Sequence, residues 1–206
     1  MGQIYIALVH HPVVDRNGRV MASSVTSLDM HDLARAARTY GVRGTFVVHP
    51  SAAQRQFIEN VTGHFVSGAG RGTHPQRGET LDKQLFVAPD LDVALEAVEV
   101  REGCKPLLVG TSALDGESAT GYGELARHLR ESDQPSLILF GTAWGLAPEV
   151  MDRLDFRLPP LRGREDTGFN HLSVRAAAAI ILDRLLGDRE ITAARAAGSE
   201  AKGAIS

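Results

Sequence analysis

The C-terminal third of the chain contains a segment whose residue types could bind a small molecule through backbone groups. Residues 140–146 have the sequence FGTAWGL, and the first of them ends the apolar run SLILF, which predicts a buried strand. Glycine after a strand permits a tight or left-handed backbone and removes a Cβ that would keep a ligand away, as at Gly141 and Gly145. An ordinary strand-to-helix turn would explain this segment equally well.

A second segment, residues 158–186, joins a polar loop to an apolar helix. The helix contains the run AAAAII, whose small residues permit close packing, and Ser173 stands at its start. The loop before it carries charged and amide side chains: Arg162, Arg164, Glu165, Asp166 and Asn170. Such a loop is costly to hold in place unless it binds something. The two segments together predict a small-molecule pocket.

A third segment near the N-terminus has a regular spacing of polar and glycine residues. Asp29 is followed by Arg35 six residues later and by Gly41 after six more, on a predicted amphipathic helix over residues 29–40. A surface helix with solvated Arg35 and Arg38 is the alternative interpretation, and it would be favoured if the segment stood alone.

The three segments together resemble the SPOUT superfamily, the knotted RNA methyltransferases that use S-adenosylmethionine. In the ribose 2′-O branch, an Asn, an Arg and a Gly follow one another at six-residue spacing. A Phe-Gly step with a nearby Gly-Leu comes later, then an aliphatic-Pro-aliphatic step and an Asn-Val-Ser-Val step before an Ala-rich helix. The corresponding residues here are Asp29, Arg35 and Gly41, then Phe140-Gly141 and Gly145-Leu146, then Leu158 to Leu161, and His171 to Val174. The closest resemblance is to a small bacterial family of S-adenosylmethionine-dependent RNA methyltransferases, over residues 4 to about 187.

The resemblance implies a fold, a cofactor and an assembly. The fold would be an α/β sheet with a C-terminal trefoil knot, in a homodimer whose active site borrows residues across the interface. S-adenosylmethionine would lie against three loops, and the implied binding residues are Gly110, Thr111, Ser112, Phe140, Gly141, Thr142, Trp144, Gly145, Leu146, Leu158, Leu161, Leu172 and Ser173. No metal ion is implied.

The resemblance also implies roles for polar residues outside those loops. Arg35 would contact the RNA phosphate or the nucleophile, while Asn170 and Ser173 would orient the target nucleotide. The net charge of −3 is a mild argument against a nucleic-acid partner, so RNA would be bound by local basic groups. The basic residues expected to contact RNA are Arg38, Arg71, Arg77, Arg162 and Arg164.

Several positions depart from the pattern of the ribose branch. The turn after Phe140 is one residue shorter and has Trp144 in a stretch that usually contains a Glu. Asp29 and His171 replace asparagines, and Arg175 stands where a small residue is usual. The resemblance therefore supports cofactor binding better than it supports any identification of the methylated atom. The alternative is a catalytically silent SPOUT module that binds S-adenosylmethionine or RNA.

Other chemistries have weaker support. The glycines of residues 67–80 follow no clear strand and open no clear helix, so this stretch is predicted to be a mobile loop and not a phosphate-binding loop. His10 and His11 have no second pair of ligands at metal-binding spacing, which favours a strand end. Ser112 and Ser173 lack a nucleophile elbow, which argues against a hydrolase.

The composition and the order of elements indicate a single α/β domain over residues 1–190. Hydrophobic residues make up 43% and charged residues 23% of the 206 residues, ordinary values for a globular protein. Predicted strands at 4–11, 45–50, 84–88, 105–113 and 135–141 alternate with predicted helices at 29–40, 51–65, 90–102 and 121–131. This alternation favours a mostly parallel sheet flanked by helices.

Three further predictions concern the rest of the chain. Residues 13–25 are predicted to form an Asn-Gly hairpin or an excursion, and residues 191–206 a disordered tail. The single Cys104 is predicted to be buried in a reducing compartment. Since no signal peptide or membrane span is visible, a cytoplasmic location is expected.

Overall fold

The computed structural model describes residues 1–113, 119–167 and 169–187. The expected disordered tail at 191–206 lies outside the described residues. At the centre is a six-stranded sheet in the order β5-β4-β1-β7-β6-β8, and all of its strand pairs are parallel. The strands are β1 (Ile4–Val9), β4 (Gly44–Val48), β5 (Leu85–Ala88), β6 (Leu107–Gly110), β7 (Ser136–Gly141) and β8 (Phe156–Arg157). The prediction of a mostly parallel sheet flanked by helices is confirmed.

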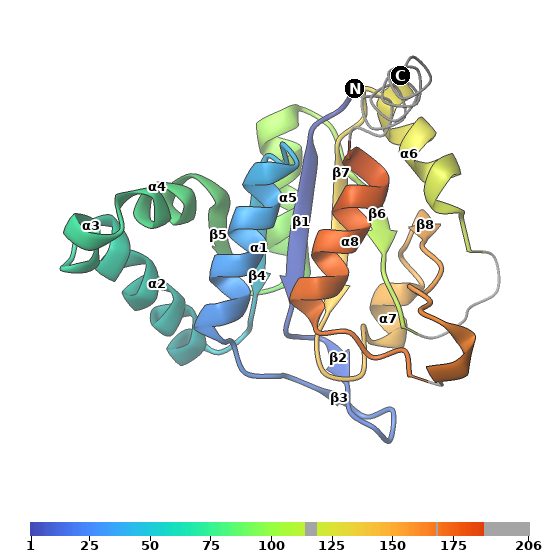
Figure 1. The fold of residues 1–206 in the computed structure, drawn as a ribbon, viewed down its shortest axis with the longest axis horizontal. Helices are drawn as coiled ribbons and strands as arrows, with labels where there is room; N and C mark the ends of the chain where they lie inside the picture. The colour runs from blue at the N-terminus through green and yellow to red at the C-terminus, as the bar shows by residue number, and fades with distance from the viewer. Residues whose placement is uncertain (114–118, 168, 188–206) are drawn as a thin grey trace, which may run out of the picture.

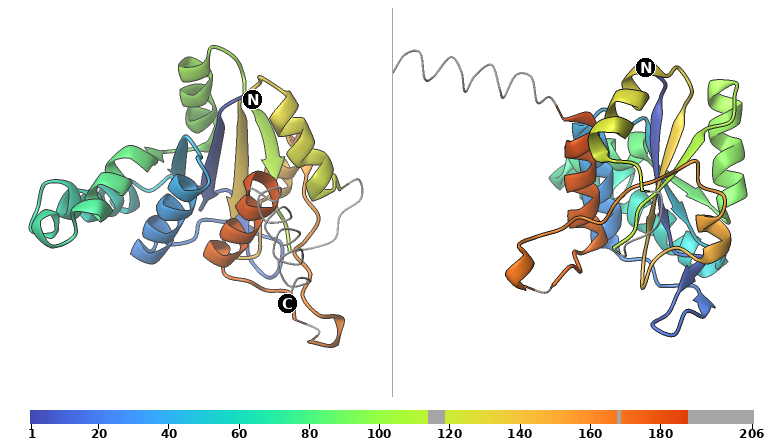
Figure 2. Two further views of the ribbon diagram at one scale, coloured as in Figure 1. Left: turned by 45° about the horizontal axis from the view of Figure 1, so that its top comes forward. Right: turned by 90° about the vertical axis from the view of Figure 1, so that its right-hand side faces the viewer.

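Alternate residues of the central strand β1 pack against opposite layers of helices. Ile4, Ile6 and Leu8 belong to one hydrophobic cluster, which includes residues of α1 (Ser27–Thr39), α6 (Tyr122–Glu131) and α8 (Val174–Leu186). Tyr5, Ala7 and Val9 belong to a second cluster, which includes residues of α5 (Leu91–Glu102) and α7 (Pro148–Met151). The two helical layers lie on opposite sides of the sheet (Figure 2). Burial on both faces explains why β1 and β7 are continuous apolar runs.

Beyond the β5 edge, three helices project from the body as an arm (Figure 1). They are α2 (Ala52–Val66), α3 (Gly70–Thr73) and α4 (Pro75–Gln84). The prediction of a mobile loop at residues 67–80 is therefore wrong. A Cβ at Gly78 would meet the Phe65 carbonyl oxygen at 2.3 Å, and one at Gly70 would meet the rings of His64 and Phe65 at 2.8 Å. These glycines allow close helix packing, which the sequence alone does not distinguish from flexibility.

The remaining segments combine a confirmed turn with elements that were not predicted. β2 (Val13–Val14) and β3 (Val20–Met21) form an antiparallel hairpin, and Gly18 in its turn has a φ of +76°. α7, β8 and the 3-10 helix at Glu165–Thr167 were not predicted. Cys104 is exposed, contrary to the prediction, because it lies in the loop between α5 and β6 and not in the strand. Within the described ranges, no helix combines the length and apolarity that a membrane span requires.

Candidate functional site

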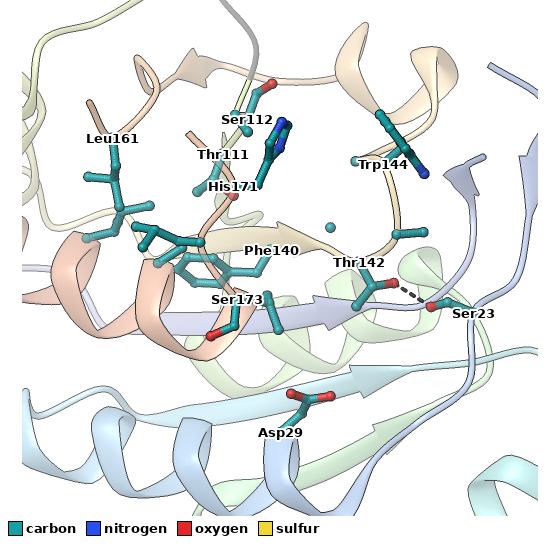
Figure 3. A pocket seen from close by; sticks show the side chains of 18 of the residues that line it. Ser23, Asp29, Thr111, Ser112, Phe140, Thr142, Trp144, Leu161, His171 and Ser173 are labelled. Atoms are coloured by element: carbon teal, nitrogen blue, oxygen red, sulfur yellow. Dashed lines mark hydrogen bonds between the residues drawn. The ribbon is translucent and has the colours of Figure 1, made fainter. Parts of the chain in front are cut away.

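A pocket of about 710 Å³ opens at the carboxyl ends of β1, β6 and β7. Open parallel sheets bind ligands at this edge, and the volume suits a cofactor-sized molecule. The lining residues come from segments far apart in the sequence: His10, Ser23, Ser24, Asp29, Thr111, Ser112, Ala113, Phe140, Gly141, Thr142, Ala143, Trp144, Gly145, Leu161, Asn170, His171, Leu172, Ser173, Val174, Ala177 and Ile181. In Figure 3, Trp144 and Leu161 lie on opposite sides of the pocket, with Phe140 between them.

Most of the expected cofactor-binding residues line this one pocket. They are Thr111, Ser112, Phe140, Gly141, Thr142, Trp144, Gly145, Leu161, Leu172 and Ser173, together with Asn170 from the expected target-orienting pair. Gly110, Leu146 and Leu158 do not line it. Leu146 and Leu158 are buried in the two hydrophobic clusters, and a Cβ at Gly110 would meet the Leu154 side chain at 2.1 Å. These three residues support the pocket wall from behind.

One side of the pocket was not predicted from the sequence. His10 follows β1, Ser23 and Ser24 follow the β2–β3 hairpin, and Asp29 lies in the first turn of α1. They reach the pocket because β1 pairs with β7, so that Val9 lies beside Gly141. The sequence signals for this side were the position of His10 at the end of a predicted strand and the place of Asp29 in the motif with Arg35 and Gly41.

The turn after β7 depends on both of its glycines. A Cβ at Gly141 would meet the Leu146 backbone nitrogen at 2.7 Å, so only glycine fits there without movement. Gly145 has a φ of +113°, and the non-glycine Ala143 also has a positive φ of 52°. The Trp144 nitrogen donates to the Val14 oxygen at 3.1 Å, and the Val14 nitrogen donates to the Gly145 oxygen at 3.0 Å. Backbone bonds to β2 therefore hold the turn in a strained conformation.

A chain of side-chain hydrogen bonds fixes the tautomer of His10. The Thr142 hydroxyl donates to the Val9 oxygen at 3.1 Å, so it accepts from the Ser23 hydroxyl at 2.5 Å. Ser23 then accepts from Nδ1 of His10 at 2.8 Å. This order leaves Nε2 of His10 as an unprotonated acceptor, and it has no hydrogen-bond partner among the described residues. Figure 3 shows the bond between Ser23 and Thr142.

The surroundings of His10 favour its neutral form. Burial, and to a smaller extent the charge of His49, lower the pKa of His10 to about 4, while the Asp29 carboxylate acts in the opposite direction. His49 is itself fixed, because its Nδ1 accepts from the Ser51 nitrogen at 2.9 Å and its Nε2 donates to the Ser23 oxygen at 2.9 Å. Burial also lowers the pKa of His49.

An ion pair joins the two helices beside the pocket. Asp29, only 6% exposed, accepts from Nη1 of Arg175 at 2.6 Å and from the Thr26 hydroxyl at 2.7 Å. Nε of Arg175 lies 3.3 Å from the Asp32 carboxylate. Asp29 and Arg175 are two of the departures from the family pattern, and they are partners in the structure. Because two carboxylates share one guanidinium, this group carries a formal charge of −1.

The loop before α8 forms the opposite wall. Nδ2 of Asn170 donates to the Ala113 oxygen at 3.0 Å, which ties this loop to the loop after β6. The Ser173 hydroxyl accepts from the Ala176 nitrogen at 3.3 Å and so caps α8. Ser173 therefore has a structural role beside its expected role in orienting the target.

The expected catalytic and RNA-binding arginines lie outside the pocket. Arg35 is exposed on α1. The pKa of His31 is lowered mainly by burial, and the charge of Arg35 contributes to the same shift. Arg38 donates to Thr80 at 2.8 Å. Arg77 stacks over the Phe65 ring with 5.2 Å between the guanidinium carbon and the ring centroid, and Arg71 is exposed on α3. The structure thus brings Arg38, Arg71 and Arg77 to the arm, whereas Arg162 and Arg164 lie in the loop beside the pocket.

The chemistry of the lining fits S-adenosylmethionine. Phe140, Leu161 and Ile181 provide apolar surface for an adenine ring. Among the described lining residues, Asp29 is the one with a formally charged side chain, with histidine taken as neutral. Its carboxylate suits a cofactor that carries a positive sulfonium. In the described part of the chain, no three His, Cys, Asp or Glu side chains form a group that could hold a metal ion.

Solved structures with a similar fold include a tRNA modifying enzyme of the TrmH/SpoU class and a probable methylase family protein. A TrmH/SpoU tRNA modifying enzyme from Aquifex aeolicus is 15% identical, with a TM-score of 0.54 over 94% of this chain and 78% of that chain. A probable methylase family protein from Haemophilus influenzae is 20% identical, with a TM-score of 0.57 over 89% and 65%. These likenesses show a SPOUT-type fold. The trefoil knot itself stays a prediction.

The chain belongs to the family of S-adenosylmethionine-dependent RNA methyltransferases, whose model matches residues 3–187. It is 40% identical over 182 residues to an uncharacterized protein of Aquifex aeolicus, covering 88% of this chain and 87% of that protein. It is 43% identical over 185 residues to a tRNA (guanine-N(1)-)-methyltransferase of Oleidesulfovibrio alaskensis, covering 90% of this chain but 42% of that protein. The chain thus spans less than half the length of this second relative. The predicted family and its cofactor, S-adenosylmethionine, are confirmed.

Proposed function

We propose that this chain transfers a methyl group from S-adenosylmethionine to a nucleotide of RNA, with tRNA as the first substrate to test. The observation that carries this proposal is one pocket built from the family's motif segments, with the Asp29 carboxylate among its described lining residues. The name of the Oleidesulfovibrio relative supports tRNA. The methylated atom is left open, because this chain corresponds to only part of that protein.

When bound, S-adenosylmethionine supplies an electrophilic methyl group on a positively charged sulfur. The protein's part is to position the reactants and to assist the departure of a proton from the nucleophile. In this proposal, the backbone of residues 111–113 and 141–145 and the apolar side chains of Phe140, Leu161 and Leu172 hold the cofactor. Asp29 provides the negative charge that complements a cationic ligand.

RNA contacts are proposed for the arginines outside the pocket. Arg38, Arg71 and Arg77 would contact phosphates along the arm, and Arg162 and Arg164 would do so beside the pocket mouth. Asn170 and Ser173 would orient the target nucleotide. A cytoplasmic location and a single domain over residues 1–190 complete the proposal.

The direct test measures methyl transfer from labelled S-adenosylmethionine to total RNA, and to purified tRNA, from a strain that lacks the gene. Calorimetric binding of S-adenosylmethionine is measured in parallel. Label in RNA supports the enzyme, whereas cofactor binding without transfer to any RNA fraction supports the catalytically silent module. A chain that binds no cofactor refutes the enzyme and the cofactor-binding module, and leaves a silent module that binds RNA.

We further propose a homodimer in which Arg35 acts at the partner subunit's site or at the seam between the subunits. This follows from the exposure of Arg35 outside its own pocket. Arg35→Ala and Gly145→Val are each expected to be inactive, and their mixture should regain partial activity as heterodimers. A monomer in light scattering at micromolar concentration would refute the arrangement. A dimer without complementation would show that Arg35 works within its own chain or not at all.

A further inference from the structure

Four residues at the mouth of the pocket expose large side chains together, and we call them the aromatic rim: Trp144, Phe169, His171 and Leu172. Trp144 is 62%, Phe169 67% and Leu172 50% exposed. The His171 ring lies 6.5 Å from the Trp144 ring and 5.4 Å from the Phe169 ring, centroid to centroid. Trp144, His171 and Leu172 also line the pocket. The rim therefore lies between solvent and the cofactor site.

The backbone holds Trp144 outward against its hydrophobic preference. It stands between Ala143 and Gly145, both of which have a positive φ. Its nitrogen donates to the Val14 oxygen, and the Gly145 oxygen accepts from the Val14 nitrogen. Tryptophan side chains without a functional role are usually largely buried in folded proteins. Strain combined with an exposed aromatic ring at a pocket mouth points to a ligand that covers the ring.

The ligand must be able to reach the cofactor through this mouth. A nucleotide held inside a helix cannot bring a base or ribose atom into a pocket, so an RNA methyltransferase acts on unpaired or extruded nucleotides. Exposed aromatic faces bind such bases by stacking, whatever the base is. Resting on the proposed function, we propose that the aromatic rim stacks an unpaired nucleobase of the RNA substrate and so directs the target nucleotide to the pocket.

A second copy of the chain is the competing occupant of the rim. Other exposed apolar side chains suit that role better, since Leu28 of α1 and Ile180 of α8 are exposed on helices that pack side by side on one face of the sheet (Figure 1). Covering the rim with a subunit would also close the mouth through which RNA has to enter. Asn170 beside the rim and the ring nitrogens of His171 within it suit a base edge.

The chain offers a direct reporter, because Trp144 is its only tryptophan. Intrinsic fluorescence is followed while the protein with bound S-adenosylhomocysteine is titrated with a single-stranded RNA of about ten nucleotides. The same strand in a blunt duplex is the comparison. Strong quenching by the single strand and weak quenching by the duplex are expected. RNA binding seen by anisotropy without any change in tryptophan emission would overturn the proposal.

Variants separate the rim from the cofactor site. Trp144→Leu should weaken binding of the single-stranded RNA about tenfold. Trp144→Phe should retain most of the affinity, and Val100→Ser, at an exposed position on α5, should not change it. Because Trp144 also lines the pocket, the affinity of each variant for S-adenosylhomocysteine is first measured by calorimetry, and RNA binding is then compared with every variant saturated. If the protein without substitutions does not bind S-adenosylmethionine, the proposed function is refuted. If Trp144→Leu binds the single-stranded RNA as tightly as that protein does, only the proposal for the rim is refuted. A dimer that Trp144→Leu converts to a monomer would assign the rim to the subunit interface instead.

Discussion

Removing the Arg175 guanidinium should destabilise the protein through the buried carboxylate that it leaves behind. Asp29 is 6% exposed, and after Arg175→Met its remaining side-chain donor is the Thr26 hydroxyl. Breaking a fully buried pair costs about 3–5 kcal/mol, and an exposed pair contributes about 1 kcal/mol at most. The Arg175 side chain is 32% exposed, so the pair lies between these limits. We expect a loss of about 2 kcal/mol, which corresponds to about 4–8 °C in Tm for a chain of this size.

A double-mutant cycle with Asp29→Asn tests the cause. Because asparagine has no charge to compensate, Arg175→Met should cost at least about 1 kcal/mol less in the Asp29→Asn background. Arg164→Met is the matched control, since Arg164 pairs with Asp166 on the surface, and it should change stability by less than about 0.5 kcal/mol. Urea unfolding of all variants at one fixed protein concentration gives the values. Equal losses for Arg175→Met and Arg164→Met, or strict additivity in the cycle, would refute the reasoning.

Three further predictions concern the pocket and one corrected position. The pKa of His10 in the folded state, about 4, is below the ordinary value of 6.5, so the unfolded chain binds more protons between these values and stability should fall by roughly 3 kcal/mol as the pH is lowered through this range. Urea unfolding of His10→Gln at several pH values should show a shallower fall, and an unchanged slope would contradict the assignment. Gly145→Ala and Gly18→Ala place similar strain at φ +113° and φ +76°, but in calorimetry only the first should weaken binding of S-adenosylmethionine; equal affinities would place the cofactor elsewhere. Cys104 is exposed, so it should react with a thiol reagent in the native protein as fast as in urea, and protection of the thiol would mean that it is covered.

The sheet could be predicted from the sequence because its strands are apolar runs bounded by turn residues and alternate with helical periodicity. The helix expected at 29–40 is observed as Ser27–Thr39, and the strand expected at 135–141 as Ser136–Gly141. The helix expected at 51–65 is α2 of the arm, but α3 and α4 could not be predicted, since Gly70 and Gly78 have the composition of a loop and reveal their packing role only beside Phe65. β8 has two residues and too little sequence for any periodicity.

One wall of the pocket could be predicted from the sequence and the other could not, for a related reason. Residues 140–146 and 170–173 lie close together in sequence and carry recognisable steps, and they form one wall together with Thr111 and Ser112. His10, Ser23 and Asp29 form the other side only because β1 lies next to β7 in the sheet. Strand order depends on long-range pairing that local pattern does not encode. The motif spacing did single out Asp29, but as part of a pattern centred on Arg35.

The geometry of α1 shows why that motif serves two different surfaces. Six residues along an α-helix correspond to about 9 Å of rise and about 600° of rotation, which leaves Arg35 about 120° away from Asp29 around the axis. Asp29 faces the pocket, so Arg35 cannot face the same cavity, and the structure leaves it exposed. A residue so placed can act on RNA outside the pocket or at a second subunit's site, but not beside its own cofactor. The charge that balances Asp29 comes instead from Arg175 on α8, whose position in the family pattern is usually small. Asp29 and Arg175, which both depart from the family pattern, therefore act together: the Asp29 carboxylate lies buried at the pocket, and α8, which also lines the pocket, provides its partner Arg175.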